Sequence, residues 1–444
     1  MLQTQDIISI LNEKQVKSIR MMFTDILGIP KSVQIPVSQV KKMLNGEILF
    51  DGSSIKGFVR IEESDMKLVP DLSTFVVADL KGYNEAFVIC DVYYPNGNRF
   101  EGDPRYRLQL VMEKCNKMGY IPMVGVEAEF FLFPIETYDN EYLYKPYISY
   151  TDKGGYFDML SLDAAEEVKR DILTKLEEFG FEVEALHHEG APSQHEIDFK
   201  YSDVLKTADR LLLFKIIVKT IALKHNLHAT FMPKPVGGIN GSGMHMHQSL
   251  FKGEINAFYD KDAPNGLSEV LLNYVGGIFK HVKSFSAVTN PLINSYKRLV
   301  PGYEAPVYIS WGEHNRSPLI RIPAKRGNST RIELRSPDPS CNPYLAFSVI
   351  INSGLDGIIN KINPLKPFEG NVYELDEDTK QKYGIDNLPA NLYQALEYMK
   401  QDPLIKETLG EHIYYNFLDA KEQEWKDYST YVTEWELEKY LYIY

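Results

Sequence analysis

Two carboxylates stand in an otherwise apolar stretch of the sequence, "GVEAEFFLF", at residues 125–133. Successive side chains of a β-strand alternate between its two faces, so Glu127 and Glu129 would share one face while apolar residues line the other. Two like charges side by side in an apolar setting are costly unless a positive charge neutralises them. The stretch therefore predicts a strand that borders a cation.

The same alternation of polar and apolar residues recurs in "GSGMHMHQSLF", "STRIELRSPDP" and "PLIRIP". Between the strands, "EALHHEGAPSQHEIDF" carries Glu189 and Glu196 around a turn. A solvated strand face explains any one of these segments. A single polar cavity lined by a curved sheet explains all of them together. The polar residues of the three added strands are His245, His247, Arg321, Arg331, Glu333 and Arg335.

These segments supply metal ligands of one chemical kind. Oxygen ligands with one imidazole and no thiolate suit Mg²⁺ or Mn²⁺ and disfavour a structural zinc site. Two divalent ions would bring four positive charges to five carboxylates, whereas one ion would leave several uncompensated. We therefore expect two metals or more. The ligand candidates are Glu127, Glu129, Glu189, Glu196, Glu333 and His245.

Other features fit a substrate that carries phosphate. "KPVGGINGSGMH" has four glycines that allow close backbone approach to a ligand, although it matches neither GxxxxGK[ST] nor GxGxxG. "RLVPGYEAPVY" places Glu304 between a glycine and a proline, where an acid is either simply solvated on a loop or part of a mobile lid over a metal site. Arginine binds carboxylate and phosphate bidentately. The arginines crowded into residues 298–335 are Arg298, Arg316, Arg321, Arg331 and Arg335.

The composition bounds the class of protein. With 444 residues, 44% of them hydrophobic, the chain has enough material for one large core and a smaller one. Its net charge of −13 argues against a nucleic-acid or anionic-membrane surface. The three cysteines show no CxxC pattern and are expected to be buried in a reducing compartment. No leader and no run of about 18 apolar residues is apparent, so we expect a cytoplasmic protein.

The first hundred residues read as strands with one or two helices. "KSIRMMF", "KSVQIPV" and "AFVICDVYY" are expected strands, and Ser38 is the expected cap of a short helix that ends near Gly46. A helix opens at Asp103 with Pro104 in its first turn. We place the domain boundary there, which gives an N-terminal domain of residues 1–103 and a catalytic domain of residues 104–444.

Beyond residue 103, strands and long helices are mixed. Helices are expected from an Asp163/Glu166 capping box to Gly180 and over residues 202–226. They do not alternate regularly with strands, which favours an α+β domain around an antiparallel sheet over a doubly wound parallel sheet. The Tyr-rich C-terminus must pack on its own core or on a neighbouring subunit.

Seven segments together resemble a known family. "FDGSSIKGF", "KGGYFD", "HHEGAPSQHEID", "KPVGGINGSGMHMHQS", "RLVPGYEAP", "NRSPLIRIP" and "STRIELRSPDPSCNPYLAF" occur in the order and spacing of class I glutamine synthetase. The resemblance covers essentially the whole chain and is to the shorter bacterial type. It implies a small N-terminal β-grasp-like domain and a large catalytic domain, whose curved antiparallel sheet is flanked by helices.

The resemblance also implies an activity with two divalent ions, Mg²⁺ or Mn²⁺, in each active site. Glutamate, ammonia and ATP would give glutamine, ADP and phosphate. One ion would be held by Glu129, Glu189 and Glu196. The other, nearer the ATP phosphates, would be held by Glu127, His245 and Glu333. The positions that match glutamate-binding residues are Glu129, Asn240, Gly241, His245, Arg298, Glu304 and Arg335.

Further matches concern the nucleotide and ammonium. In the implied mechanism Asp51 takes a proton from ammonium, and a flap carrying Glu304 shields γ-glutamyl phosphate from water. Arg316 would act on the transferring phosphoryl group. The positions around ATP are Glu184, His247, Ser249, Arg316, Arg321 and Arg331. The positions around ammonium are Asp51, Ser54, Tyr156, Glu189 and Glu304.

The family assembles as two stacked six-membered rings, in which one subunit's N-terminal domain completes its neighbour's site and the C-terminal segment reaches the opposite ring. A nitrogen-responsive transcription factor is a candidate partner. Gly190 and Ser193 depart from a more usual Val and Gly, and Lys325 from a small residue. None of these touches an expected ligand. Modification of Tyr393 is not expected, because the insertion of the longer enzymes is missing.

Two alternatives use the same fold. A γ-glutamyl ligase would take an amine or polyamine as acceptor, whereas Asp51, Ser54 and Glu304 together favour ammonia. A non-catalytic regulatory relative would lack metal ligands, whereas all six expected positions are filled.

Overall fold

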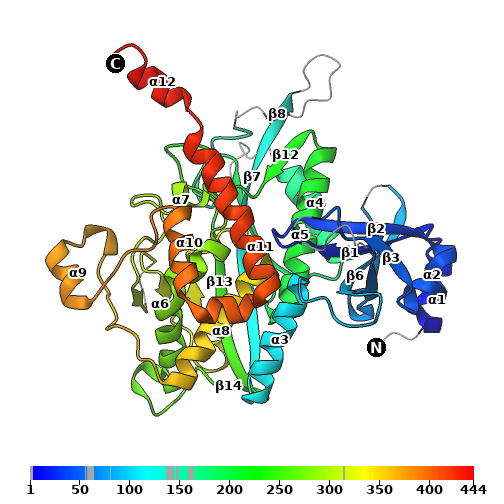
Figure 1. Ribbon diagram of the computed structural model, residues 1–444, viewed down its shortest axis with the longest axis horizontal. Coiled ribbons are helices and arrows are strands. Elements are labelled where there is room, and N and C mark those ends of the chain that lie inside the picture. Colours follow the sequence, from blue (N-terminus) through cyan, green and yellow to red (C-terminus); the bar gives the residue numbers. More distant parts are fainter. Residues whose placement is uncertain are drawn as a thin grey trace.

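The computed structural model describes residues 4–55, 57, 65–80, 82–136, 145–146, 150–158, 165–313 and 316–444. Figure 1 shows two parts. A small sheet with its helices lies at one side, in blue, and a larger sheet wrapped by helices makes up the rest. In the described part of the chain, no helix has the length and apolar character needed to span a membrane.

The small sheet is built from the described part of the first hundred residues. Its order is β2-β1-β6-β4-β3, with β5 also on β6; β1 and β6 run parallel and the other pairs antiparallel. The expected strands in this region are confirmed. The elements are α1 (Thr4–Glu13), β1 (Ser18–Thr24), β2 (Pro30–Pro36), α2 (Val40–Leu44), β3 (Ile48–Asp51), β4 (Asp65–Pro70), β5 (Val76–Asp79) and β6 (Asn84–Tyr93).

The expectation that Ser38 caps the short helix is wrong. Ser38 lies inside a 3₁₀ turn, Val37–Gln39, and α2 begins after Gln39, whose side chain makes no capping hydrogen bond. The 3₁₀ turn takes the place of a side-chain cap, because its backbone carbonyl groups can accept hydrogen bonds from the first N–H groups of α2.

The large sheet carries the unusual strands of the sequence. Its order is β15-β16-β17-β13-β7-β10-β9, and all of these neighbours run antiparallel except β15 and β16. The 16-residue strand β7 lies in the middle and pairs with several short strands along its length. The strands are β7 (Ile121–Glu136), β9 (Val183–His188), β10 (Gln194–Phe199), β13 (Met244–Lys252), β15 (Trp311–Gly312), β16 (Ile320–Arg321) and β17 (Ile332–Leu334).

One face of this sheet packs on helices. Val126, Ala128 and Met246 belong to the main hydrophobic core and are at most 3% exposed. The helices against this core are α3 (Pro104–Lys117), α4 (Glu166–Glu178), α5 (Val204–Lys224), α6 (Glu269–Thr289) and α8 (Pro343–Asn360). The polar residues at the alternate positions must therefore face the other side of the sheet, away from these helices.

Two helix starts test the expected boundaries. Asp103 caps α3 by accepting a hydrogen bond from the Arg105 backbone N–H at 2.9 Å, as expected. Helix α4 begins at Glu166, while Asp163 of the expected capping box lies outside the described residues. The third expected helix, residues 202–226, corresponds to α5.

Arg105 also ties the two parts of the molecule together. Its guanidinium is 2% exposed and pairs with Asp71 and Asp91 of the small sheet region, each at 2.7 Å, and with Asp209 of α5 at 2.8 Å. A buried arginine that neutralises three carboxylates fixes the two parts against each other, since losing it would leave buried charge unpaired.

The C-terminal segment extends away from the rest of the chain (Figure 1). Helix α11 (Pro403–Thr430) packs on the body, but α12 (Glu434–Tyr440) and the residues after it are exposed, and Tyr442 and Tyr444 are 92% and 99% exposed. The C-terminal end therefore does not pack on the core of its own chain, which was one of the two expectations for it.

Candidate active site

Strand register brings the expected ligands into rows across one face of the large sheet. His245 of β13 pairs with Glu127 of β7, and Glu129 of β7 pairs with Glu196 of β10. On the outer side, Glu333 of β17 pairs with Arg321 of β16. The chain positions of these residues are far apart, so the sheet itself assembles the site.

Glu127, His245 and Glu333 form the first cluster. One ligand-type atom from each lies within 4.8 Å of the others. Glu127 bonds Nδ1 of His245 at 3.2 Å and Nε2 of His247 at 2.7 Å. Although burial opposes it, these two imidazoles lower the pKa of Glu127 below its usual range. The carboxylate of Glu127 is therefore ionised, as a metal ligand must be.

Glu129, Glu189 and Glu196, the other expected ligand set, line the same cavity, and their carboxyl groups raise one another's pKa; the ligand-type atoms within 4.8 Å of one another on this side belong to His187, Glu196 and Asp198. Burial, followed by the charge of Glu127, raises the pKa of Glu129 to about 7. Burial and the neighbouring Glu129 raise the pKa of Glu189 to about 8. Burial likewise raises the pKa of Glu196 well above its usual range. Carboxyl groups held so close together favour a bound cation, which would return all three to the ionised form.

The donor chemistry fits a hard divalent ion. Together the two expected ligand sets offer five carboxylates and one imidazole, without a thiolate among the described residues near them, which matches Mg²⁺ or Mn²⁺. Glu129 is oriented by two further bonds, since its Oε2 accepts from Gln194 Nε2 at 2.7 Å and from the Gly243 backbone N–H at 3.0 Å. Fixed carboxylates of this kind are typical of a prepared metal site.

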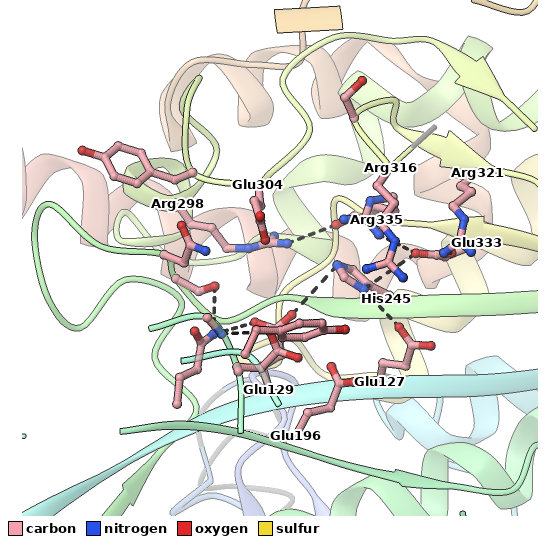
Figure 2. Close-up of a pocket in the computed structure, with 18 of the residues that line it drawn as sticks. Glu127, Glu129, Glu196, His245, Arg298, Glu304, Arg316, Arg321, Glu333 and Arg335 are labelled. Atoms are coloured by element: carbon pink, nitrogen blue, oxygen red, sulfur yellow. Dashed lines mark hydrogen bonds and ion pairs between the residues drawn. The ribbon is translucent and has the colours of Figure 1, made fainter. Parts of the chain in front are cut away.

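Arginines border the same cavity (Figure 2). Glu333 accepts from Arg335 Nη1 at 2.6 Å and from Arg321 Nη1 at 2.8 Å. Arg298 is 2% exposed and donates to the backbone carbonyls of Ser336 and Arg335 at 2.8 and 3.1 Å. These guanidinium groups are held in place before any anion binds, which suits recognition of carboxylate or phosphate.

The cavity has a volume of about 640 Å³. The flap residue Glu304 lies on it with φ of 54°, a conformation that non-glycine residues rarely adopt. Tyr156, from a distant segment, hydrogen-bonds to Arg316, and this bond raises the pKa of Arg316. The expected site residues that line the cavity are Glu127, Glu129, Tyr156, Glu189, Glu196, Asn240, Gly241, His245, Arg298, Glu304, Arg316, Arg321, Glu333 and Arg335.

Two contacts hold the flap around Glu304. The Tyr373 hydroxyl donates to the carbonyl oxygen of Ala305 at 2.9 Å. The Lys234 ammonium lies 3.9 Å from the ring centroid of Tyr303, in a cation–π contact. The flap is thus attached on one side to the segment after α8 and on the other to the glycine-rich loop.

A second cavity, of about 370 Å³, adjoins the first, and Glu127 and Asp198 line both. Within it, Arg331 Nε donates to Nδ1 of His247 at 3.1 Å, which leaves Nε2 of that ring to donate to Glu127. The sequence predicted one cavity, whereas the structure divides the polar residues between two that share a wall. The expected nucleotide residues in the second are Glu184, His247, Ser249 and Arg331.

Two expected residues stand apart. Asp51 ends β3 in the small sheet and Ser54 lies just after it, and within the described part of this single chain neither lines either cavity. Asp51 is exposed and accepts from the Ser53 hydroxyl and backbone N–H at 2.6 and 2.9 Å. Hydrogen bonds from Ser53 lower the pKa of Asp51, so it is a carboxylate at neutral pH.

Several cavity residues were not predicted from the sequence. Gln194 and Asp198 share the face of β10 that carries Glu196, and the alternation that revealed Glu127 and Glu129 would have revealed them too. His187 pairs with Glu196 across β9 and β10 and could be found only from that register. The lining residues without any pattern in the sequence are Tyr303, Ser317, Asn371 and Tyr373.

Comparison with known families agrees with this geometry. Residues 15–95 match the family model "Glutamine synthetase, beta-Grasp domain" and residues 101–440 match "Glutamine synthetase, catalytic domain". The chain belongs to the glutamine synthetase family. The expected class I resemblance and the α+β fold with an N-terminal β-grasp domain are thereby confirmed.

This family member has relatives of nearly equal length. It is 55% identical to a glutamine synthetase of Thermotoga maritima, over 98% of each chain. It is 53% identical to one of Methanosarcina mazei, over 98% of this chain and 97% of that one.

Solved structures share the family fold. A Plasmodium falciparum glutamine synthetase has a TM-score of 0.88 and 28% identity, over 99% of both chains. A structure described as "GmaS/ADP complex-Conformation 1" has a TM-score of 0.88 and 30% identity, over 98% of this chain and 99% of that chain.

Proposed function

We propose that this chain makes glutamine from glutamate, ammonia and ATP through γ-glutamyl phosphate, releasing ADP and phosphate. One observation carries the proposal: the six expected metal ligands and four arginines line one cavity of a chain that is 55% identical to a glutamine synthetase. The joined second cavity gives room for a nucleotide whose phosphates reach the shared wall at Glu127.

Two divalent ions, Mg²⁺ or Mn²⁺, are proposed for the two clusters. Glu129, Glu189 and Glu196 would hold one, and Glu127, His245 and Glu333 the other. When bound, such ions screen negative charge on the phosphates and on the attacking carboxylate. The apolar faces of β7 and β13 are buried, so these ligands stand on rigid strands and need little rearrangement.

The arginines would bind and orient the two anionic substrates. Arg298 and Arg335, with Asn240 and Gly241, are the proposed partners of glutamate, and Arg316 and Arg321 face the phosphoryl group as it transfers. In the second cavity, Arg331, His247, Ser249 and Glu184 would contact the nucleotide. Because ATP and the glutamate γ-carboxylate repel each other, fixed cations on both sides favour the transition state.

Ammonium would enter from the side of the small domain. Tyr156, Glu189 and Glu304 line the cavity, but Asp51 and Ser54 do not in the described single chain. We assign them to the site of a neighbouring subunit, where Asp51 would take the proton that makes ammonia a nucleophile. Its lowered pKa keeps it in the basic form. The flap with Glu304 would exclude water, which otherwise hydrolyses the acyl phosphate.

The same reasoning makes the protein a homo-oligomer. A dodecamer of two six-membered rings accounts for the distance of Asp51 from the cavity of its own chain. It also gives the exposed residues of α12 a surface to cover in the opposite ring. A domain boundary near residue 103, a cytoplasmic location and a nitrogen-responsive transcription factor as partner belong to this proposal as well.

Turnover assays with a panel of acceptors test the function. Purified protein with Mg²⁺ or Mn²⁺, ATP and glutamate should form glutamine from ammonia, one phosphate per glutamine, and Glu129→Ala should lower the rate at least a thousandfold. Faster turnover with putrescine than with ammonia would assign the polyamine ligase instead. Absence of phosphate release with either metal would overturn the proposal in favour of a regulatory relative.

A further inference from the structure

A buried aspartate lies behind the metal-binding loop and outside the proposed catalytic set. The Asp152 side chain is fully buried, and its Oδ1 accepts from Nε2 of His188 at 2.8 Å. The same oxygen accepts from the backbone N–H groups of Ser193 at 3.1 Å and Gly154 at 3.2 Å. One carboxylate oxygen therefore joins the segment of residues 150–158 to two points of the loop.

These two points stand at the two ends of the loop. His188 directly precedes Glu189, and its Nδ1 donates to the carbonyl oxygen of Glu189 at 2.6 Å. Contacts with oxygen atoms at both ring nitrogens fix the orientation of the His188 ring. Ser193 lies three residues before Glu196. Asp152 thus holds the backbone next to one carboxylate ligand and close to the other.

Ser193 has a conformation that needs such support. Its φ is 65°, in the left-handed region that favours glycine. Its hydroxyl accepts from the Thr151 backbone N–H at 2.7 Å and bonds the Thr151 hydroxyl at 2.9 Å. Gln194, which orients Glu129, follows directly. Thr151 and Asp152 together therefore fix the turn from which Gln194 and Glu196 extend.

Asp152, His188 and His195 could themselves suggest a metal site, because their ligand-type atoms lie within 4.8 Å of one another and all three are buried. The hydrogen bonds argue otherwise. Oδ1 of Asp152 already accepts from three donors, and both nitrogens of His188 face oxygen acceptors. A ring nitrogen that donates a proton has no lone pair left for a metal.

We propose that Asp152 is a positioning residue that holds the turn between β9 and β10, and with it Glu189 in the turn and Glu196 on β10, in the geometry required for metal binding. The inference rests on the proposed function, in which Glu189 and Glu196 are metal ligands. Groups that orient metal ligands typically change metal affinity by about 10- to 100-fold when they are removed. Asp152 should act through Glu189 and Glu196, and so on metal affinity more than on the chemical step.

The test measures Mn²⁺ binding to the full-length protein in the absence of substrates. The electron paramagnetic resonance signal of free Mn²⁺ reports how much of the ion remains unbound. Asp152→Asn keeps the size of the side chain but replaces a carboxylate oxygen by a donor. We expect Mn²⁺ to bind at least tenfold more weakly. The apparent KM for Mn²⁺ should rise by the same factor, while kcat at saturating Mn²⁺ stays within about threefold of the parent.

Asp158→Asn is the matched control. Asp158 is exposed on the same segment, and its Oδ2 accepts from the Gly155 backbone N–H at 2.8 Å, a bond that stays within the segment. Its Mn²⁺ affinity should equal that of the parent. If Asp152→Asn does not assemble, Thr151→Val removes the hydroxyl that bonds Ser193, Asp152 and the Leu132 carbonyl at the same turn, and should weaken Mn²⁺ binding about two- to tenfold.

Each failure has its own signature. Parental Mn²⁺ affinity in Asp152→Asn, or in Thr151→Val where the first variant does not assemble, overturns the positioning role. A parent protein that binds no Mn²⁺ overturns the proposed metal site instead. A fall in kcat with unchanged Mn²⁺ affinity would also refute the inference, since Asp152 would then act on the chemistry and not on the metal.

Discussion

Metal binding to the ligand-free protein should release protons at neutral pH, and the structure sets their number. The pKa of Glu129 is about 7 and that of Glu189 about 8. At pH 7 the first carboxyl is about half protonated and the second about nine-tenths protonated, and Glu196 adds to both. A cation that binds all three in ionised form must displace these protons. We expect release of more than about one proton per site.

Isothermal titration of the apo protein with Mn²⁺ in buffers of different ionisation enthalpy measures this release. Raising the pH to 9 should reduce the release, because Glu129 and Glu189 are then largely ionised before the metal binds. Glu189→Gln should lower the release at pH 7 by about nine-tenths of a proton. Binding without proton release at pH 7, or release equal at pH 7 and 9, would refute the assigned charge state of the cluster.

The same pKa values set the pH dependence of stability. In the apo protein Glu129 and Glu189 bind protons more tightly when folded than when unfolded, where their pKa is about 4.5. Their contribution to the free energy of unfolding is complete below about pH 4.5 and is lost as the pH rises through about 7 to 8. Saturating Mn²⁺ should remove this loss, which unfolding in urea at pH 5 and 8 would show.

Three further predictions concern the site and its frame. In Gly243→Ala the new Cβ would overlap the tethered guanidinium of Arg298, so the KM for glutamate should rise about 10- to 100-fold while the KM for ATP stays within twofold in steady-state assays. Tyr373→Phe removes the bond to Ala305, and the phosphate released per glutamine formed should exceed one, because the open flap becomes about two- to tenfold more populated. His281 bonds Asp402 at 2.6 Å and Asp356 at 3.0 Å, and although burial opposes it, these carboxylates raise its pKa. That contribution is complete below about pH 6.5 and lost as the pH rises, so His281→Gln should lower the free energy of unfolding by about 1.5–3 kcal/mol at pH 6 and by less at pH 9. An unchanged KM for glutamate would contradict the argument for Gly243→Ala, and a phosphate-to-glutamine ratio of one would contradict that for Tyr373→Phe. An equal loss of unfolding free energy at pH 6 and pH 9 would contradict that for His281→Gln.

The polar face of the large sheet was predictable because strand alternation is a local rule. Glu127, Glu129, His245 and Glu333 each lie between two apolar residues of their strand, and the structure places all four on one face of the sheet. The rule gives the face of each strand but not the order of the strands. The division into two cavities at Glu127 depends on that order and could not be read from the sequence.

Residues that act from outside the sheet could not be predicted from spacing. Tyr373 reaches the flap from the segment after α8, and Asp152 reaches the metal loop from a segment without regular structure. Their places follow from long-range packing. Ser38 shows that a local rule can also fail. Its side chain suits a helix cap, but the residue lies inside a 3₁₀ turn that precedes the helix.

The separation of Asp51 from the cavity of its own chain has a genetic consequence. If each active site joins the small domain of one subunit to the large domain of the next, two dead variants can rescue each other in mixed rings. Co-expression of Asp51→Ala with Glu129→Ala in equal amounts would leave about a quarter of the sites with both halves intact. A hybrid ring assembled from two inactive parents would thus regain activity that neither parent shows alone.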